Sequence, residues 1–330
     1  MPRAPSHPSP SVAAKPDALP DAISPLYAHG LERTKELDFE HRSHERSVAR
    51  VTLSLRFLRA AWRRFWTRTQ AATAAPVPHP SAGTIALTFV GHATVMITTP
   101  AARVLTDPLL ENSLCGLRRA RAAAIADADL ADVGLVLISH AHRDHLSRTT
   151  LARLRRTATV VVPPQCKALI ADLGFARVVE LGAGQAFTFT DVEVISVPAR
   201  HDGARGVLNR RQRGACGYIV RTQSRAVYFA GDTGYFSGFA EIGRQFAPDV
   251  ALLPIAGYQP APFRQQHLSP LDAVYAFEDL GARILIPITH GSFELGYEPI
   301  AEPLTWLRSL AQEKNIAPTI LEHGQTCLIR

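Results

Sequence analysis

The residues best suited to chemistry in this chain lie in one hexapeptide, His140-Ala141-His142-Arg143-Asp144-His145. Three imidazoles and a carboxylate within six residues offer nitrogen and oxygen ligands, which suit zinc, iron or nickel. His140 and His142 can reach one ion together, whereas Asp144 and His145 are better placed to turn toward a second. The spacing therefore predicts a metal site rather than a polar loop with scattered histidines.

Three further candidate ligands, His201, Asp232 and His290, stand where the motif itself stands, directly after an apolar run. The run before the motif, 135–139, predicts a buried strand. Strand ends on one edge of a sheet can converge in space, and loops on a rigid scaffold often carry chemistry. Alone, each residue would be an ordinary turn Asp or a satisfied His, but their shared placement predicts that they complete the site. The runs that precede them are Val192–Val197, Ala226–Ala230 and Ile284–Thr289.

This order of residues resembles the metallo-β-lactamase fold superfamily, whose signature is His-x-His-x-Asp-His followed by a later His, Asp and His. Within it, the chain is most similar to RomA-like proteins and to N-acylphosphatidylethanolamine-hydrolysing phospholipase D. The narrower resemblance runs in order from about residue 84 to residue 295. The segments that carry it are Val90–Val95, Leu105–Pro108, Pro198–His201, Tyr228–Tyr235, Phe239–Gly243, His267–Pro270 and His290–Phe293.

The resemblance implies an α/β fold, an αββα sandwich of two mixed β-sheets flanked by helices. It also implies two divalent metal ions, with zinc expected and iron or manganese as alternatives. The implied ligands of the first ion are His140, His142 and His201. Those of the second are Asp144, His145 and His290, with Asp232 bridging the two. Two ions about 4 Å apart lower the pKa of a bridging water, so a metal-bridging hydroxide is the expected nucleophile.

Other site residues follow from the resemblance. Asp144 is also expected to orient the nucleophile. His267, which precedes a predicted helix, is expected to contact a phosphate or protonate the leaving group, and a simple helix-entry role is the alternative. Tyr258 is expected at the substrate. His92, in a Gly-His-Ala-Thr turn, is expected beside the site as a hydrogen-bonding residue that does not bind metal.

The leading functional hypothesis is a phosphodiesterase that acts on a phospholipid-like substrate. Hydrolysis of a carboxylic ester or lactone is the enzymatic alternative, and a mononuclear-iron persulfide dioxygenase or a non-catalytic metal-binding protein is the alternative of another class. Asp232 stands where true metallo-β-lactamases commonly use Cys, which favours a phosphoester or ester hydrolase. The chain also departs from the phospholipase: the Trp often found before the final Gly-x-Phe is absent, and His290-Gly291 follow Thr289 directly.

The N-terminal portion, residues 1–80, is predicted to be an extension to a catalytic domain at 81–330. Its first part is rich in Pro, Ala and Ser, as mobile segments are. Residues 46–70 place apolar side chains at helical spacing and contain seven arginines, which equals the formal net charge of +7. This pattern predicts a basic amphipathic helix, which is expected either to dock on the catalytic domain or to contact an anionic membrane. No nucleic-acid partner is expected. The substrate is a small molecule or lipid, and the pattern leaves the oligomeric state open.

Four scattered cysteines without a Cys-x-x-Cys pair predict reduced thiols and no thiolate zinc site. No apolar leader and no membrane-length apolar stretch occurs, so a cytoplasmic protein is expected, with possible peripheral contact at the inner face of the membrane. The remaining pattern predicts strands at 84–99, 103–106, 159–162, 177–181, 217–222, 250–254 and 322–330. It predicts helices at 151–157, 166–173, 239–246 and 270–280.

Overall fold

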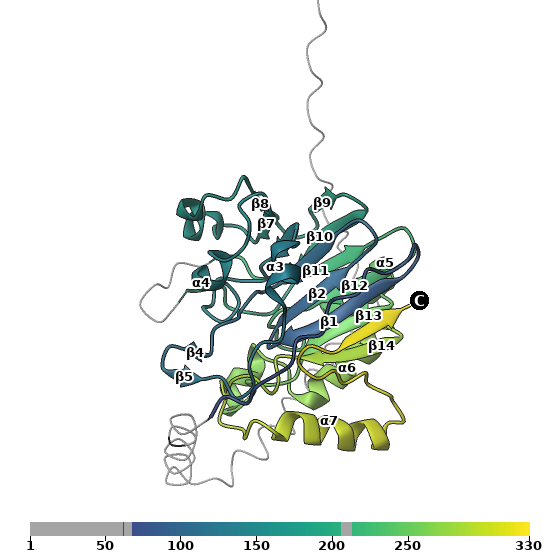
Figure 1. Ribbon diagram of the computed structural model, residues 1–330. Helices are drawn as coiled ribbons and strands as arrows, with labels where there is room; N and C mark the ends of the chain where they lie inside the picture. The colour runs from purple at the N-terminus through teal and green to yellow at the C-terminus, as the bar shows by residue number, and fades with distance from the viewer. Residues whose placement is uncertain (1–61, 63–67, 206–212) are drawn as a thin grey trace, which may run out of the picture.

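Two mixed β-sheets packed face to face form the centre of the molecule (Figure 1). The computed structural model describes residues 62, 68–205 and 213–330. The first sheet has the strand order β15-β1-β2-β3-β6-β7-β8 and the second β14-β13-β12-β11-β10-β9. The first sheet consists of β1 (Ile85–Gly91), β2 (Thr94–Thr98), β3 (Arg103–Thr106), β6 (Leu135–Leu137), β7 (Thr159–Val162), β8 (Arg177–Glu180) and β15 (Thr326–Ile329). The second consists of β9 (Ala186–Phe189), β10 (Val192–Pro198), β11 (Cys216–Arg221), β12 (Ala226–Phe229), β13 (Val250–Pro254) and β14 (Ile284–Ile288).

Each sheet is antiparallel on one side and parallel on the other. Strands β3, β6, β7 and β8 run parallel in the first sheet, as do β12, β13 and β14 in the second. Parallel strands covered on both faces read as continuous apolar runs, and all five residues of β13 are indeed buried. The inner faces of the two sheets share one core, in which Phe89 of β1 and Phe229 of β12 are fully buried.

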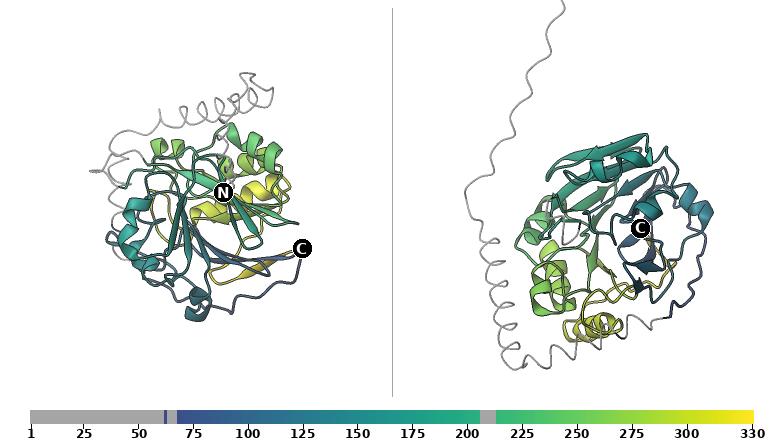
Figure 2. Two further views of the ribbon diagram at one scale, coloured as in Figure 1. Left: turned by 90° about the horizontal axis from the view of Figure 1, so that it is seen from above. Right: turned by 90° about the vertical axis from the view of Figure 1, so that its left-hand side faces the viewer.

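Helices cover the outer faces of both sheets, which confirms the αββα sandwich (Figure 2). Over the second sheet lie α5 (Gly238–Phe246), α6 (Pro270–Leu280) and α7 (Glu302–Glu313). Over the first lie α3 (Asp127–Ala131), α4 (Arg148–Leu151) and the short 3-10 helices η1 (Lys167–Leu169) and η2 (Ala171–Leu173). A third 3-10 helix, η3 (Ala261–Gln265), leads into α6, and a small hairpin pairs β4 (Ser113–Leu114) with β5 (Leu117–Arg118).

Two predicted helices are wrong in detail. The helix expected at 151–157 is the short α4 at Arg148–Leu151, because the Ser147 hydroxyl accepts a hydrogen bond from the Thr150 amide and starts the helix earlier. The helix expected at 166–173 is a pair of 3-10 turns, η1 and η2, separated at Ile170, whose backbone leaves the helical region. By contrast, β3, β13 and α6 begin and end where the sequence predicts.

Part of the expected N-terminal extension is attached to the folded domain. The Gln70 amide donates to the Ala120 carbonyl, and the Ala122 amide donates back to Gln70. Val77 is buried, and its amide donates to the carboxylate of Asp129. The basic helix predicted at 46–70 lies almost wholly outside the described residues. None of the helices in the described part of the chain combines the length and apolar character needed to cross a bilayer.

Candidate metal centre

The site is built where loops from the two sheets meet. The hexapeptide follows β6 of the first sheet, while His201 follows β10 and Asp232 follows β12 of the second. Loops of the two sheets approach closely at Gly231, where a Cβ would lie 2.4 Å from the Cβ of Ser139. Gly231 also has a φ of 62°, a conformation that favours glycine. A glycine is therefore required here to bring Asp232 beside the hexapeptide.

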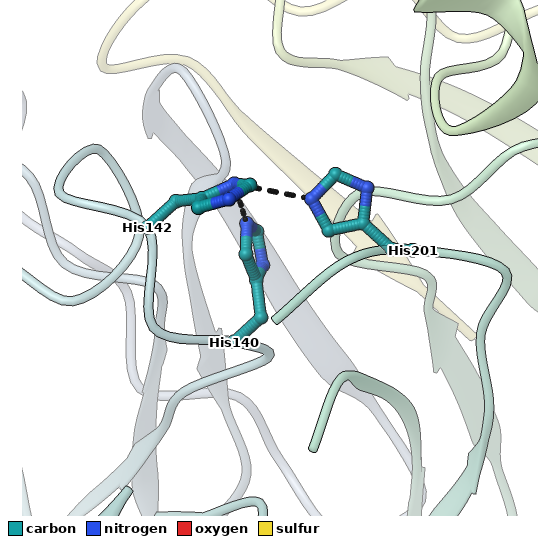
Figure 3. A group of neighbouring side chains, drawn as sticks. All are labelled: His140, His142 and His201. Carbon is teal, nitrogen blue, oxygen red and sulfur yellow. Dashed lines mark hydrogen bonds between the residues drawn. The ribbon is translucent and has the colours of Figure 1, made fainter. Parts of the chain in front are cut away.

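His140, His142 and His201 point their ring nitrogens at one another (Figure 3). The Nδ1 atom of His142 lies 2.9 Å from Nε2 of His140 and 3.1 Å from Nε2 of His201. Nitrogens bound at about 2.0–2.1 Å around a tetrahedral zinc ion lie roughly 3.3 Å apart, so these separations suit a shared ion. This is the set that the sequence predicts for the first metal.

A second cluster contains Asp144, His145 and Asp232, which the sequence also predicts. The Nε2 atom of His145 lies 3.0 Å from Oδ2 of Asp232 and 3.4 Å from Oδ2 of Asp144. His92 joins this cluster, because its Nε2 lies 3.3 Å from the same Oδ2 of Asp144. The carboxylate of Asp232 thus reaches the second cluster, and it also groups with His201 on the side of the first.

Asp107 orients a ligand in each cluster, a role that sequence reasoning did not assign to it. Its fully buried carboxylate lies 2.6 Å from Nδ1 of His145 and accepts the Ser139 hydroxyl at 2.5 Å. The Ser139 hydroxyl in turn lies 2.9 Å from Nδ1 of His140. Metal-binding histidines commonly donate their other N–H to such an acceptor. The position of Asp107 directly after β3 could have indicated a site residue, although its partners lie some 30 residues further along the chain.

The electrostatics of the clusters match metal ligands. Burial lowers the pKa of His201 to about 3 and holds that of His140 well below its usual value, so both imidazoles are neutral with a free lone pair. Burial alone would lower the pKa of His145, but the carboxylates of Asp232, Asp144 and Asp107 raise it well above its usual value. A metal cation would satisfy the same carboxylates.

Unpartnered buried atoms complete the test of fit. Oδ1 of Asp232 is buried without a hydrogen-bond partner among the described residues, and Nε2 of His145, although close to the carboxylates of Asp232 and Asp144, makes no hydrogen bond with either. Buried polar atoms are normally paired, and an exception calls for an explanation such as a missing ion. The two clusters therefore fit a pair of divalent cations, which these side chains would hold between the two sheets.

The structure does not bring His290 to this centre, contrary to the sequence prediction. Its ring stacks on Phe89 with centroids 5.1 Å apart, and its Nε2 lies 3.2 Å from the Pro287 carbonyl. Burial, followed by the neighbouring His323, lowers the pKa of His290 to about 3. The preceding residue, Thr289, has a φ of 60°, and this turn of the backbone directs the side chain at 290 away from the metal clusters.

His267 and Tyr258 differ in their relation to the centre. Nδ1 of His267 lies 3.6 Å from Oδ2 of Asp232, and its ring lies against His201 with centroids 5.1 Å apart. The Tyr258 hydroxyl instead donates to Glu302 of α7 at 2.8 Å, and the side chain is buried. A buried phenol needs such a partner. The sequence predicts that Tyr258 lies at the substrate, but in the structure its hydroxyl is bonded to Glu302 instead.

Cys216 is not part of either cluster in the described structure. Its buried Sγ faces the Ser139 carbonyl at 3.7 Å, and burial raises the pKa of the thiol to about 11. The anionic side chain that lies within reach of both clusters at the end of β12 is Asp232.

Comparisons with known proteins agree with this geometry. Residues 102–290 match the model of the β-lactamase superfamily domain. An uncharacterized protein of Mycobacterium tuberculosis is 33% identical over 272 residues, which cover 76% of this chain and 73% of that protein. N-acyl-phosphatidylethanolamine-hydrolyzing phospholipase D 1 of Caenorhabditis elegans is 30% identical over 253 residues, covering 70% and 71% of the two chains. A UPF0173 metal-dependent hydrolase of Pyrococcus furiosus is 32% identical over 244 residues, covering 73% and 98%.

Solved structures show the same fold. Igni18, a metallo hydrolase from Ignicoccus hospitalis, superposes with a TM-score of 0.58 at 23% identity and covers 75% of this chain and 99% of its own. The chain therefore belongs to the metallo-β-lactamase superfamily. It is a metal-dependent hydrolase of that superfamily, and its clustered His and Asp side chains are consistent with a two-metal site.

Proposed function

We propose that the protein hydrolyses a phosphodiester bond in a phospholipid-like substrate. The observation that carries this proposal is the position of His267, an imidazole that lies beside the Asp232 carboxylate and outside the predicted ligand sets of the two ions. His267 is 20% exposed, so a substrate can reach it from solvent while its other side touches the centre. The similarity to the Caenorhabditis phospholipase, whose name describes this chemistry, supports the substrate class.

The residues of the centre divide the work of hydrolysis. A bound pair of divalent ions would supply an activated water at neutral pH and neutralise the phosphate oxygens. Asp144 is 13% exposed and can accept a hydrogen bond from that water, which fixes its direction. His267 can donate a proton to the departing alkoxide, because an imidazole near neutral pH serves as a general acid.

An apolar side chain beside His267 suits a lipid tail. Phe263 of η3 is 44% exposed, and its ring centroid lies 6.3 Å from that of His267. Large exposed aromatic side chains at a site entrance bury apolar ligand surface. We propose that Phe263 contacts an acyl chain while the phosphate group lies over the metal centre.

The test compares substrates on zinc-loaded protein. We expect cleavage of N-acylphosphatidylethanolamine in mixed micelles to phosphatidate and the N-acylethanolamine, detected by mass spectrometry. We also expect turnover of bis(4-nitrophenyl) phosphate. Phe263→Ser should slow the lipid reaction and leave the nitrophenyl reaction unchanged. Hydrolysis of 4-nitrophenyl butyrate or a lactone, without cleavage of either phosphodiester, would contradict the proposal and favour the carboxylic ester alternative.

The role of His267 has a sharper test. His267→Gln should lower kcat on the lipid by about 100-fold or more, because its alkoxide leaving group needs a proton. The same variant should cleave bis(4-nitrophenyl) phosphate nearly as fast as the wild type, because nitrophenolate leaves without protonation. Equal losses on the two substrates would assign His267 to binding or folding rather than to proton donation.

A further inference from the structure

The ligand set of the second ion is incomplete once His290 is excluded. Asp144, His145 and Asp232 remain, and zinc or iron at such a site takes at least one more strong ligand or solvent. His92 is the other described histidine that groups with Asp144 and His145, with ligand atoms within 4.8 Å of one another. We infer that His92, on the turn between β1 and β2, replaces His290 as the histidine ligand of the second metal.

The distance between His92 and Asp144 suits two ligands of one ion. Asp107, which orients His145, lies 2.6 Å from its Nδ1, as expected for a charge-assisted hydrogen bond. The contacts of Asp144 Oδ2 with His92 and with His145 are longer, 3.3 and 3.4 Å. Atoms bound at about 2.0–2.2 Å around one ion lie roughly 3.2–3.6 Å apart. The nitrogen of His92 therefore has the spacing of a fellow ligand.

The ring of His92 has no other polar engagement among the described residues. Nδ1 is buried and has no hydrogen-bond partner there, so among the described residues Asp144 is the hydrogen-bonding neighbour of the ring. The other ring contacts of His92 are with His145 of the cluster and, edge-on, with Phe293, so the Nε2 atom faces the cluster as a ligand would.

The backbone conformation accounts for the different positions of the His92 and His290 side chains. His92 has a φ of 61° and Thr289 a φ of 60°, and such values are uncommon for His and anomalous for a β-branched residue. The Thr289 amide donates to the His92 carbonyl at 2.9 Å, so the two left-handed residues hold each other. With the backbone held in this way, the side chain of His92 lies in the second cluster and that of His290 lies on Phe89.

The test measures metal content, so it does not depend on the substrate proposed above. We would load His92→Asn and His290→Phe with zinc, remove excess ion, and count ions by mass spectrometry. Asn tolerates the left-handed backbone at position 92, and Phe preserves the stack on Phe89. His92→Asn should hold one ion tightly and the second at least about 100-fold more weakly, whereas His290→Phe should hold two. Two tight ions in His92→Asn, or loss of one in His290→Phe, would overturn the inference.

A spectroscopic variant guards against simple misfolding. In His92→Cys loaded with cobalt(II), a thiolate at position 92 should bind the ion and add a near-ultraviolet thiolate-to-cobalt band. The wild-type cobalt protein has no such ligand at this position. Because a supporting role would place no sulfur on the metal, absence of the band in a folded, cobalt-loaded His92→Cys protein would also overturn the inference. A failure of phosphodiester hydrolysis in the wild type would sink the proposed function alone.

Discussion

Asp107 is the residue on which the orientation of both metal clusters depends, through His145 directly and through Ser139 to His140. We predict that Asp107→Asn lowers zinc affinity by about 10–100-fold, because it removes a charged acceptor behind the ligand histidines. Competition with a zinc chelator would measure the change. Cys216→Ser is the matched control, and it should keep wild-type affinity since the thiol lies outside the clusters. Unaltered affinity in Asp107→Asn would refute the orienting role.

His290 should make the metal-free protein sensitive to acid. Burial lowers its folded-state pKa to about 3 from the ordinary 6.5, so the unfolded chain binds a proton that the folded chain does not. The folded protein therefore keeps its full free energy of unfolding above about pH 6.5, and that free energy decreases as the pH falls from 6.5 toward 3. Urea unfolding in chelator should show that the wild type loses about 1.4 kcal/mol per pH unit more than His290→Phe between pH 6 and 4. Parallel curves would show that His290 has no such shift.

At the scale of elements, the approach of the β12 loop to the β6 loop positions the centre. We predict that Gly231→Ala loses stability and zinc together, because the new Cβ meets Ser139 and displaces Asp232. Gly281→Ala is the control, since Gly281 has a nearly equal φ of 61° and nothing within 4 Å of its Cβ position. The control should cost about 1–2 kcal/mol from the backbone alone. Gly231→Ala should cost about 1–3 kcal/mol more, and equal losses would contradict the close-approach argument.

The elements that the sequence predicts best have strong local signals. β13 is apolar throughout, and α6 begins with Ser269 and Pro270 and ends at Gly281, so its limits are encoded nearby. By comparison, β9 alternates exposed and half-buried residues, and α7 buries only four of its twelve residues. β9 is held by pairing with its neighbour β10, and α7 by packing on α6, so the apolar pattern of neither segment defines it alone.

The candidate site likewise contains residues that local sequence signals predict and residues that they do not. The hexapeptide, His201 and Asp232 could be found from residue type and position after a strand. The departure of His290 could not, because it depends on the left-handed backbone of Thr289 and its contact with the turn at His92. The predicted position of Tyr258 at the substrate differs from the structure for a similar reason, because its partner, Glu302, lies on a helix 44 residues further along the chain.

At the scale of the whole molecule, the open question is what the basic N-terminal segment contacts. We propose that the segment at 46–70 binds an anionic membrane and brings the centre to its lipid substrate. Trp62 is 68% exposed, as expected for an interfacial aromatic. Each Arg close to an anionic surface contributes about 1 kcal/mol, less at high salt.

Truncation tests this proposal. A chain that begins at Arg68 keeps the contacts of Gln70 and Val77 with the domain. It should lose binding to phosphatidylserine vesicles in a flotation assay, yet cleave bis(4-nitrophenyl) phosphate at the wild-type rate. Trp62→Ser in the full chain should weaken vesicle binding even at low salt. An insoluble or inactive truncated protein would show instead that the segment docks on the domain.

Two divalent ions bound in this centre should support hydrolysis. The decisive measurement is a titration of the metal-free protein with zinc, followed by turnover of bis(4-nitrophenyl) phosphate. Activity should be absent without metal and rise until two equivalents per chain are bound, whereas His142→Ala should stay nearly inactive throughout. Full activity at one equivalent, turnover without metal, or normal turnover in His142→Ala would contradict it.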